Sequence, residues 1–320
     1  MRNALSKIWL MIVLAFGWAF LSPPALAWGP EGHAVAGDLA ASLLTPTAKR
    51  QVKSILGNKR LGDYEVACWP DIIRGTQEYE AIYPRNGQWH FVEFNATEKY
   101  DEDFELKPPA DGDDIVTQIG RWQKELADTD KPMPRRRDAL KFLVHFVGDV
   151  HQPLHCAYRY GDMGGNMIPV HSFKGKKYSF GVDFEPEYAS NIHSVWDESM
   201  VLELKAGRTR PAFAKWLKED LGPGQLGSWS QGAPLNWAID SYWRARKEAY
   251  RWADGESLPF KWTGPGMDLT SKNYIDARLP MAKEQLQKAG VRLAHLLNAA
   301  LDPGYVKPAA PKPAAAEPAK

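Results

Sequence analysis

The chain has 320 residues, with 40 basic side chains, 39 acidic side chains and two cysteines. This near balance of charge argues against a protein held to nucleic acid by bulk electrostatic attraction, so affinity for an anionic substrate must come from a local site. Two cysteines are too few for a disulfide scaffold, and Cys68 and Cys156 either pair or remain buried thiols.

The first 27 residues have the features of a secretory signal peptide. Basic residues precede an apolar run over residues 8–21, and Ala-Leu-Ala at residues 25–27 supplies a small-residue cleavage site. The alternative is a membrane anchor, but the run is shorter than the roughly 20 residues that a membrane-spanning helix needs. We therefore expect an exported product, periplasmic or secreted, that begins at Trp28 and has no membrane segment.

Helical periodicity dominates the rest of the chain. From Asp113 onward, apolar residues 115, 119, 122 and 126 fall on one helix face, with Asp113 or Asp114 as a cap. The same pattern predicts helices over residues 136–150, 191–204, 236–253 and 272–301, the last with a possible kink at Pro280. Alternating strand patterns are scarce, so we expect a mainly α fold.

Two long loops are predicted to interrupt these helices, over residues 96–112 and 161–190. Loops of this length in a compact domain are uncommon and often functional. Residues 304–320 are rich in proline, alanine and lysine, and are predicted to be a disordered tail.

The stretch FLVHFVGDVHQPLH, residues 142–155, carries the most chemical information. His145 and Asp149 are four residues apart on a predicted helix, so their side chains lie on one face, one turn apart. A single pair of this kind is more often a surface ion pair than a metal site. This helix is strongly apolar around the pair, however, and burying charge without a partner or a metal is costly.

The same spacing recurs in NIHSVWDE, where His193 and Asp197 are four residues apart among apolar neighbours. His155, Asp71 and His90 add further candidate ligands. A mixture of imidazole and carboxylate suits zinc or another first-row ion better than calcium, which prefers oxygen ligands. Two such pairs together therefore predict a buried metal centre.

Six motifs between Trp28 and Asp197 point to a family. They are W-G-x-x-G-H, W-x-D-x-x-R, W-H-F, H-F-x-G-D-x-H-Q-P-L-H, G-G-N and N-x-H-x-x-W-D. Together they resemble the type I nucleases, which are secreted three-zinc nucleases and 3′-nucleotidases that prefer single strands. The resemblance implies a single helical domain over residues 28–303, of the kind that these nucleases share with zinc-dependent phospholipase C.

The resemblance also implies three zinc ions per chain. The ligands of the first ion would be Asp71, His90, His145 and Asp149. Those of the second would be His155, His193 and Asp197. Those of the third would be His33, a bridging Asp149, and the α-amino nitrogen and carbonyl oxygen of Trp28.

The proposed Trp28 ligand has its own chemical logic. An α-amino group has a pKa of about 8, so a metal ion displaces its proton easily near neutral pH. An uncleaved amide nitrogen does not bind in this way, so cleavage after Ala27 would create the ligand. Metal binding of this kind competes with protons, and activity should therefore fall in acid.

The reaction that the resemblance implies is hydrolysis of single-stranded DNA and RNA to 5′-phosphorylated products, with removal of phosphate from 3′-nucleotides. A hydroxide shared by the two ions that Asp149 bridges would attack phosphorus in line. Asp71 would orient the nucleophile, and Arg74 would contact the developing charge. The alternative for Arg74 is a surface salt bridge. We expect a monomer whose partners are these nucleic acid substrates.

A nucleobase pocket is also implied by the resemblance, with Phe91 stacking, Glu93 hydrogen-bonding, and Gly164 and Asn166 lining it. Stacking needs an unpaired base, which favours single strands. Phe91 is alternatively a core aromatic, and Glu93 stands where an aspartate is more familiar. Residues 174–190 resemble an insertion that forms either a cationic flap or a solvated loop.

Two other classes of protein compete with this interpretation. In zinc-dependent phospholipase C the last ligand is typically a glutamate and the first histidine lies further from the tryptophan, whereas here these features are Asp197 and a spacing of five residues. A non-catalytic zinc carrier would gain nothing from Arg74 or from a base pocket. We therefore expect a nuclease.

Overall fold

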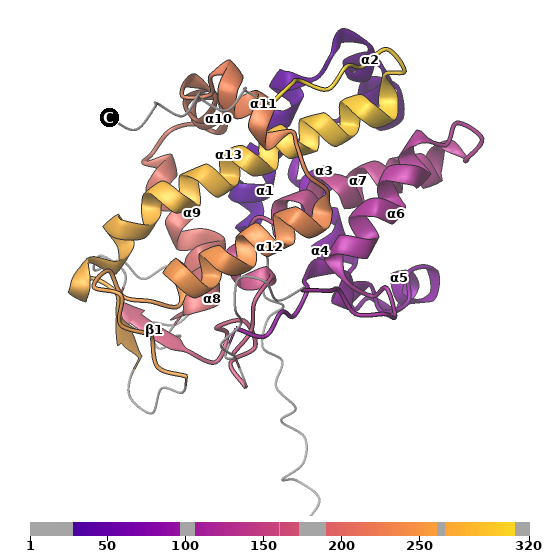
Figure 1. Cartoon of the computed structure of the whole chain (residues 1–320). Coiled ribbons are helices and arrows are strands. Elements are labelled where there is room, and N and C mark those ends of the chain that lie inside the picture. Colours follow the sequence, from indigo (N-terminus) through magenta and orange to yellow (C-terminus); the bar gives the residue numbers. More distant parts are fainter. Residues whose placement is uncertain (1–27, 97–105, 160, 173–189, 261–265, 311–320) are drawn as a thin grey trace, which may run out of the picture.

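The computed structural model describes residues 28–96, 106–159, 161–172, 190–260 and 266–310 (Figure 1). The predicted signal peptide lies outside the described residues. So do residues 311–320 of the predicted tail and all of the predicted insertion except Ser190.

The chain is mainly helical, as the sequence predicts. The first helices are α1 (Gly29–Leu43), α2 (Pro46–Leu56), α3 (Tyr64–Ala67), α4 (Trp69–Ile73), α5 (Gln77–Ile82), η1 (Asn86–His90), α6 (Ile115–Ala127), α7 (Met133–Asp149) and η2 (Pro153–His155). They are followed by α8 (Ile192–Ser194), η3 (Val195–Ser199), α9 (Met200–Lys205), α10 (Arg210–Glu219), α11 (Pro223–Trp229), α12 (Pro234–Arg244), η4 (Ala245–Ala249), η5 (Ser271–Asn273) and α13 (Tyr274–Leu301).

One small sheet accompanies the described helices. Its strands are β1 (Pro169–Ser172), β2 (Ser190–Asn191) and β3 (Met267–Asp268), in the order β2-β1-β3. Strand β1 is antiparallel to β2 and parallel to β3. The sheet connects the predicted long loop to the segment that precedes α13.

The helices predicted from residue 113 onward are present with boundaries shifted by a few residues, and those over residues 191–204 and 236–253 each include a π-helical turn. Of the two candidate caps for α6, Asp114 is the cap, and its carboxylate accepts hydrogen bonds from the backbone of Val116 and Thr117. Asp113 instead accepts a hydrogen bond from the indole of Trp89. Helix α13 continues through Pro280.

Helix α13 forms the centre of the fold. It packs against α1, α6 and α7, and Figure 1 shows it crossing the molecule beside α1. Gly290 allows this close approach, because a Cβ atom there would lie 2.6 Å from the side chain of Leu39. Aromatic side chains fill the space between α4, α6 and α7, and Phe142 stacks on Trp122 with ring centroids 4.3 Å apart.

Both cysteines are free and buried. Of the two alternatives that the sequence left open, a disulfide or two buried thiols, the structure therefore has the buried thiols. The thiol of Cys156 lies 3.4 Å from the carbonyl of Val150, and burial raises the pKa of Cys68 to about 12.

Among the described residues, no helix is long and apolar enough to span a bilayer.

Candidate metal centre

The C-terminal end of α7 carries two of the predicted ligands, and both are fully buried. His145 Nε2 lies 3.4 Å from Asp149 Oδ2, as their spacing on one helix face predicts. The other oxygen of Asp149 faces a different residue, with Oδ1 3.1 Å from His33 Nε2 on α1. The carboxylate of Asp149 therefore lies between two groups of candidate ligands.

The first group joins α4 and η1 to α7. Asp71 Oδ1 lies 3.5 Å from His90 Nδ1, and Asp71 Oδ2 lies 3.4 Å from His145 Nε2. His90 Nδ1 is also 3.0 Å from Asp149 Oδ2. Asp71, His90 and His145 thus direct their ligand atoms at one small volume.

The second group adds α1. The imidazole of His33 stacks on that of His145 with centroids 3.9 Å apart and an interplanar angle of 16°. Together with Asp149 these residues form another set of clustered ligand atoms. The close approach depends on Gly148, because a Cβ atom there would lie 2.6 Å from His33 Nδ1.

The third group consists of His155, His193 and Asp197. His155 Nε2 lies 3.0 Å from His193 Nε2, which is 3.4 Å from Asp197 Oδ2. The sequence predicts a continuous α-helix here, and this is wrong in detail, because α8 leads into the π-helix η3. A π-helical turn widens the backbone and is frequent at functional sites.

Backbone carbonyls fix the orientation of three of these imidazoles. His145 Nδ1 donates to the carbonyl of Ala67 over 2.7 Å, and His155 Nδ1 donates to the carbonyl of His90 over 2.7 Å. His193 Nδ1 donates to the carbonyl of Gly164, also over 2.7 Å. Since a carbonyl oxygen only accepts, each neutral ring presents the lone pair of Nε2 to the centre, as metal-binding histidines do.

The positions of these lone pairs indicate whether a cation fits among the candidate ligands. In the third group two Nε2 atoms face each other at 3.0 Å, so neutral rings bring two acceptors together, close to a carboxylate. Asp197 Oδ2 is buried and makes no hydrogen bond in the described part of the chain, and the same holds for Asp71 Oδ1. One cation bound by His155, His193 and Asp197 would satisfy the acceptors of the third group, and another would satisfy Asp71 in the first group. The donor sets suit zinc.

The electrostatics of the third group agree with this conclusion. Burial lowers the pKa of His193 to about 4 and lowers that of His155 well below its usual range, with Arg74 acting in the same direction. Burial also raises the pKa of the Asp197 carboxyl well above its ordinary value. A bound cation stabilises the carboxylate and binds the neutral imidazoles.

Gln152 belongs to the centre, although the sequence did not single it out. Its side chain is fully buried, and Nε2 donates to Asp197 Oδ1 over 2.6 Å while Oε1 accepts from the backbone of Leu154. This leaves Asp197 Oδ2 facing the histidines. The signal for Gln152 was its place between ligand positions in H-Q-P-L-H.

Trp28 and Arg74 lie beside the ligands. The side chain of Trp28 is fully buried, and its carbonyl accepts a hydrogen bond from the backbone of His33 over 3.3 Å. Gly29 packs against the backbone of Asp197, which brings the start of α1 to the third group. Burial lowers the pKa of His90 to about 3, and the charge of the half-buried Arg74 acts in the same direction.

The four predicted base-pocket residues differ in burial and in local contacts. Gly164 is buried at a φ of 63°, and a Cβ atom there would lie 2.7 Å from the carbonyl of Leu154. Asn166 is half-buried, and its Nδ2 donates to the carbonyl of Met163. Phe91 is half-buried and Glu93 is exposed. Stacking and hydrogen bonding by these side chains stay predictions.

His151 is absent from all three groups of candidate ligands. Its Nδ1 donates to the carbonyl of Val147 at the end of α7, and its Nε2 accepts from Arg292 over 2.7 Å. Burial lowers the pKa of His151 well below its usual range. The ring therefore ends the helix behind the centre.

The fold and this cluster define a helical protein with three groups of histidine and aspartate that could hold metal ions, two of which share His145. Residues 28–302 match the model of the S1/P1 nuclease family, and the chain belongs to that family. It is accordingly a hydrolase that acts on phosphodiester bonds.

Relatives that match over most of their length agree with this assignment. Nuclease P1 of Penicillium citrinum is 28% identical over 286 residues, covering 85% of this chain and 97% of the relative. Endonuclease 2 of Arabidopsis thaliana is 25% identical over 300 residues, covering 90% and 96%. Nuclease S1 of Aspergillus oryzae is 26% identical over 283 residues, covering 85% and 91%.

Proposed function

We propose that this nuclease is a zinc-dependent endonuclease of single-stranded DNA and RNA that leaves 5′-phosphates and also hydrolyses 3′-nucleotides. The observation that carries the proposal is the position of Asp149, whose two oxygens face His33 and His90 at 3.1 and 3.0 Å. A carboxylate in that position suits a bridge between two ions, which is the arrangement that phosphoryl transfer uses.

We assign the groups to three zinc ions. The first would be held by Asp71, His90, His145 and Asp149, the second by His155, His193 and Asp197, and the third by His33, Asp149 and the amino terminus and carbonyl of Trp28. Support for the first two comes from the clustered ligand atoms. Support for Trp28 comes from its buried place one turn before His33.

Zinc ions bound here would lower the pKa of water to supply a nucleophile near neutral pH and would neutralise charge on the phosphate. Asp71 is the most exposed of the histidine and aspartate ligands at 9%, and its Oδ1 makes no hydrogen bond in the described part of the chain. It can therefore orient the attacking water. Arg74 would donate its planar fork to the phosphoryl oxygens as charge develops.

Export and maturation belong to the same proposal. Cleavage after Ala27 would free the amino group of Trp28, and the product would be a periplasmic or secreted monomer. An uncleaved chain would then lack the third ion.

A side-by-side assay tests the function. Purified protein is incubated with single-stranded DNA, single-stranded RNA, a 3′-nucleotide and a phosphatidylcholine analogue. We expect phosphate release from the 3′-nucleotide. We also expect 5′-phosphorylated fragments from the single-stranded DNA and from the single-stranded RNA. Lipid cleavage without nucleotide release would instead indicate a phospholipase, and no hydrolysis by the zinc-loaded protein would indicate a carrier.

Replacing Phe91 tests the base pocket. Because stacking on an aromatic face contributes about 1–3 kcal/mol per base, we expect Phe91→Ala to raise KM for a 3′-nucleotide about tenfold or more with little change in kcat. Phe91→Tyr keeps the aromatic face and should behave like the wild type. Steady-state kinetics on a 3′-nucleotide and on a base-free sugar 3′-phosphate make the comparison, and equal losses on both would remove Phe91 from the pocket.

Replacing Gln152 tests how Asp197 is oriented. Leucine has nearly the same volume but donates no hydrogen bond, so the carboxylate would lose its contact at Oδ1. We expect Gln152→Leu to weaken zinc binding about 10- to 100-fold, as measured by competition with a chelator. Gln118→Leu is the matched control, because Gln118 is also buried but donates to the carbonyl of Gly112 instead. Equal zinc affinity in the two variants would contradict the role of Gln152.

A further inference from the structure

The loop of residues 161–168, called the Gly164 loop below, packs directly on a candidate metal ligand. The carbonyl of Gly164 accepts the hydrogen bond from His193 Nδ1 over 2.7 Å. The loop also lies close to the backbone that carries this histidine, because a Cβ atom at Gly165 would lie 2.4 Å from the side chain of Ile192. The orientation of the His193 ring therefore depends on the conformation of this loop.

A buried ion pair holds the Gly164 loop. Arg159 Nε donates to Asp162 Oδ2 over 3.0 Å, and the backbone amide of Arg159 donates to Asp162 Oδ1 over 2.9 Å. The backbone carbonyl of Asp162 accepts a hydrogen bond from the amide of Met167. Arg159 is 3% exposed and Asp162 is 0% exposed. Asp162 thus contacts both the chain before the loop and the far end of the loop.

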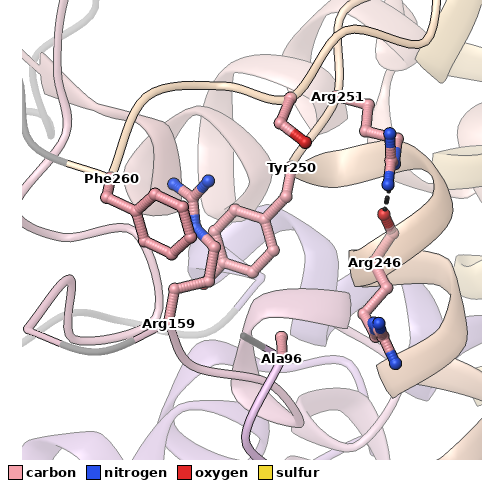
Figure 2. A pocket seen from close by; sticks show the side chains of 7 residues that line it. Ala96, Arg159, Arg246, Tyr250, Arg251 and Phe260 are labelled. Carbon is pink, nitrogen blue, oxygen red and sulfur yellow. Dashed lines mark hydrogen bonds between the residues drawn. The ribbon is translucent and has the colours of Figure 1, made fainter. Parts of the chain in front are cut away.

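Arg159 is itself fixed by a distant part of the chain. Its two terminal nitrogens donate to the carbonyls of Leu258 and Pro259 over 2.6 and 3.0 Å. Its guanidinium lies 4.1 Å from the ring centroid of Tyr250 and 4.7 Å from that of Phe260, and Figure 2 shows it beside both rings. All three nitrogens of the guanidinium have an acceptor, which holds this planar group in a single orientation.

Stability alone is a poor explanation for such a pair. Removing two charges from water costs about as much free energy as their attraction contributes, so apolar side chains of similar volume often stabilise a fold equally well. A buried pair does, however, select one arrangement of the chain, because another arrangement leaves a buried charge without its partner. The contacts of Arg159 and Asp162 place this selection at the Gly164 loop.

We propose that Arg159 and Asp162 are positioning residues for the second zinc ion. They hold the Gly164 loop so that its carbonyl accepts from His193 Nδ1, which keeps Nε2 of that ring directed at the other ligands of the ion. The inference rests on the proposed function. Loss of the pair should weaken this ion alone, because the proposed ligands of the other two ions come from the amino-terminal segment, α4, η1 and α7.

The direct test removes both charges at once, because a single unpaired charge in a buried site can prevent folding. In the double variant R159M/D162N we expect the affinity for the second zinc ion to fall about 10- to 100-fold, while the other two ions stay bound. Competition with a chelator measures the affinity. His193→Ala removes a ligand of the same ion and so identifies which ion is weakened.

A second measurement follows the ring of His193 in the absence of any reaction. In zinc-loaded protein labelled with nitrogen-15 in histidine, NMR detects the proton on Nδ1 and its exchange with water. We expect this proton to exchange faster in R159M/D162N than in the wild type. His145 is the internal reference, because its Nδ1 donates to the carbonyl of Ala67 over the same distance of 2.7 Å and should be unaffected.

Arg136→Met is the matched control. Arg136 is also a buried arginine that donates to a backbone carbonyl, that of Leu126, over 3.0 Å. It lies near the start of α7, about 20 Å along the helix from Asp149. This variant should lose stability but bind all three zinc ions as tightly as the wild type.

The outcomes separate this inference from the proposed function. If the protein binds as many zinc ions after His193→Ala as before, the assignment of the second ion in the proposed function is overturned. If His193→Ala loses one ion but R159M/D162N binds zinc as tightly as the wild type, only the positioning role is overturned. Equal losses of zinc affinity in R159M/D162N and Arg136→Met also overturn that role, because the losses would then reflect stability alone.

Discussion

Asp149→Ala is expected to abolish hydrolysis of every substrate, with activity below about a thousandth of the wild type. The two oxygens of its carboxylate face His33 and His90, so its loss removes a ligand from two proposed ions at once. We expect the variant to bind one zinc ion firmly, through His155, His193 and Asp197. Kinetics and metal analysis of the same preparation measure both effects.

The control for this prediction lies on the same helix. Asp138 is half-buried on α7 and accepts a hydrogen bond from the hydroxyl of Tyr83 over 2.6 Å. Asp138→Ala should cost about 1 kcal/mol of stability but leave zinc content and activity unchanged. An Asp149→Ala protein that keeps its full zinc content and substantial activity would remove the bridging carboxylate from the mechanism.

Gly148→Ala is expected to have the second largest effect, although glycine supplies no ligand. The new Cβ atom would lie 2.6 Å from His33 Nδ1 and 2.9 Å from the adjacent ring carbon, so the ring must move. Overpacking of this kind costs about 1–3 kcal/mol and here displaces a proposed zinc ligand. We expect a lower free energy of unfolding, loss of one zinc ion and a loss of activity of at least about a hundredfold.

Gly120→Ala provides the comparison, because nothing lies within 4 Å of a Cβ atom at that position on α6. Alanine favours a helix, so this variant should be as stable as the wild type or slightly more stable, with full activity. Thermal unfolding, zinc content and kinetics of the two variants measure the contrast. Equal stability, zinc content and activity of the two variants would show that the close packing of Gly148 against His33 is not needed for the metal centre.

The parts of the centre that could be predicted from the sequence are local ones. The spacing of His145 and Asp149 fixes their common face on α7. The residue type predicts an aspartate cap for α6 but does not choose between Asp113 and Asp114. The motifs between Trp28 and Asp197 predicted the family, and the family model confirms it.

The remaining features depend on contacts between distant segments. Helices α3, α4 and α5 have only four to six residues, too few for a periodic pattern to show. The π-helical turn at Asp197 follows β2, and the hydrogen bond from Gln152 to that residue joins it to the segment after α7. A cavity likewise joins Ala96 and Arg159 to residues 246–260, which no local pattern connects (Figure 2).

One measurement tests the central claim that export creates a ligand of a three-zinc centre. It is the intact mass of the active, exported protein, determined together with its zinc content. The account predicts a chain that begins at Trp28 and binds three zinc ions at full occupancy. A fully active chain that begins at any other residue, or that binds fewer than three zinc ions at saturation, would contradict it.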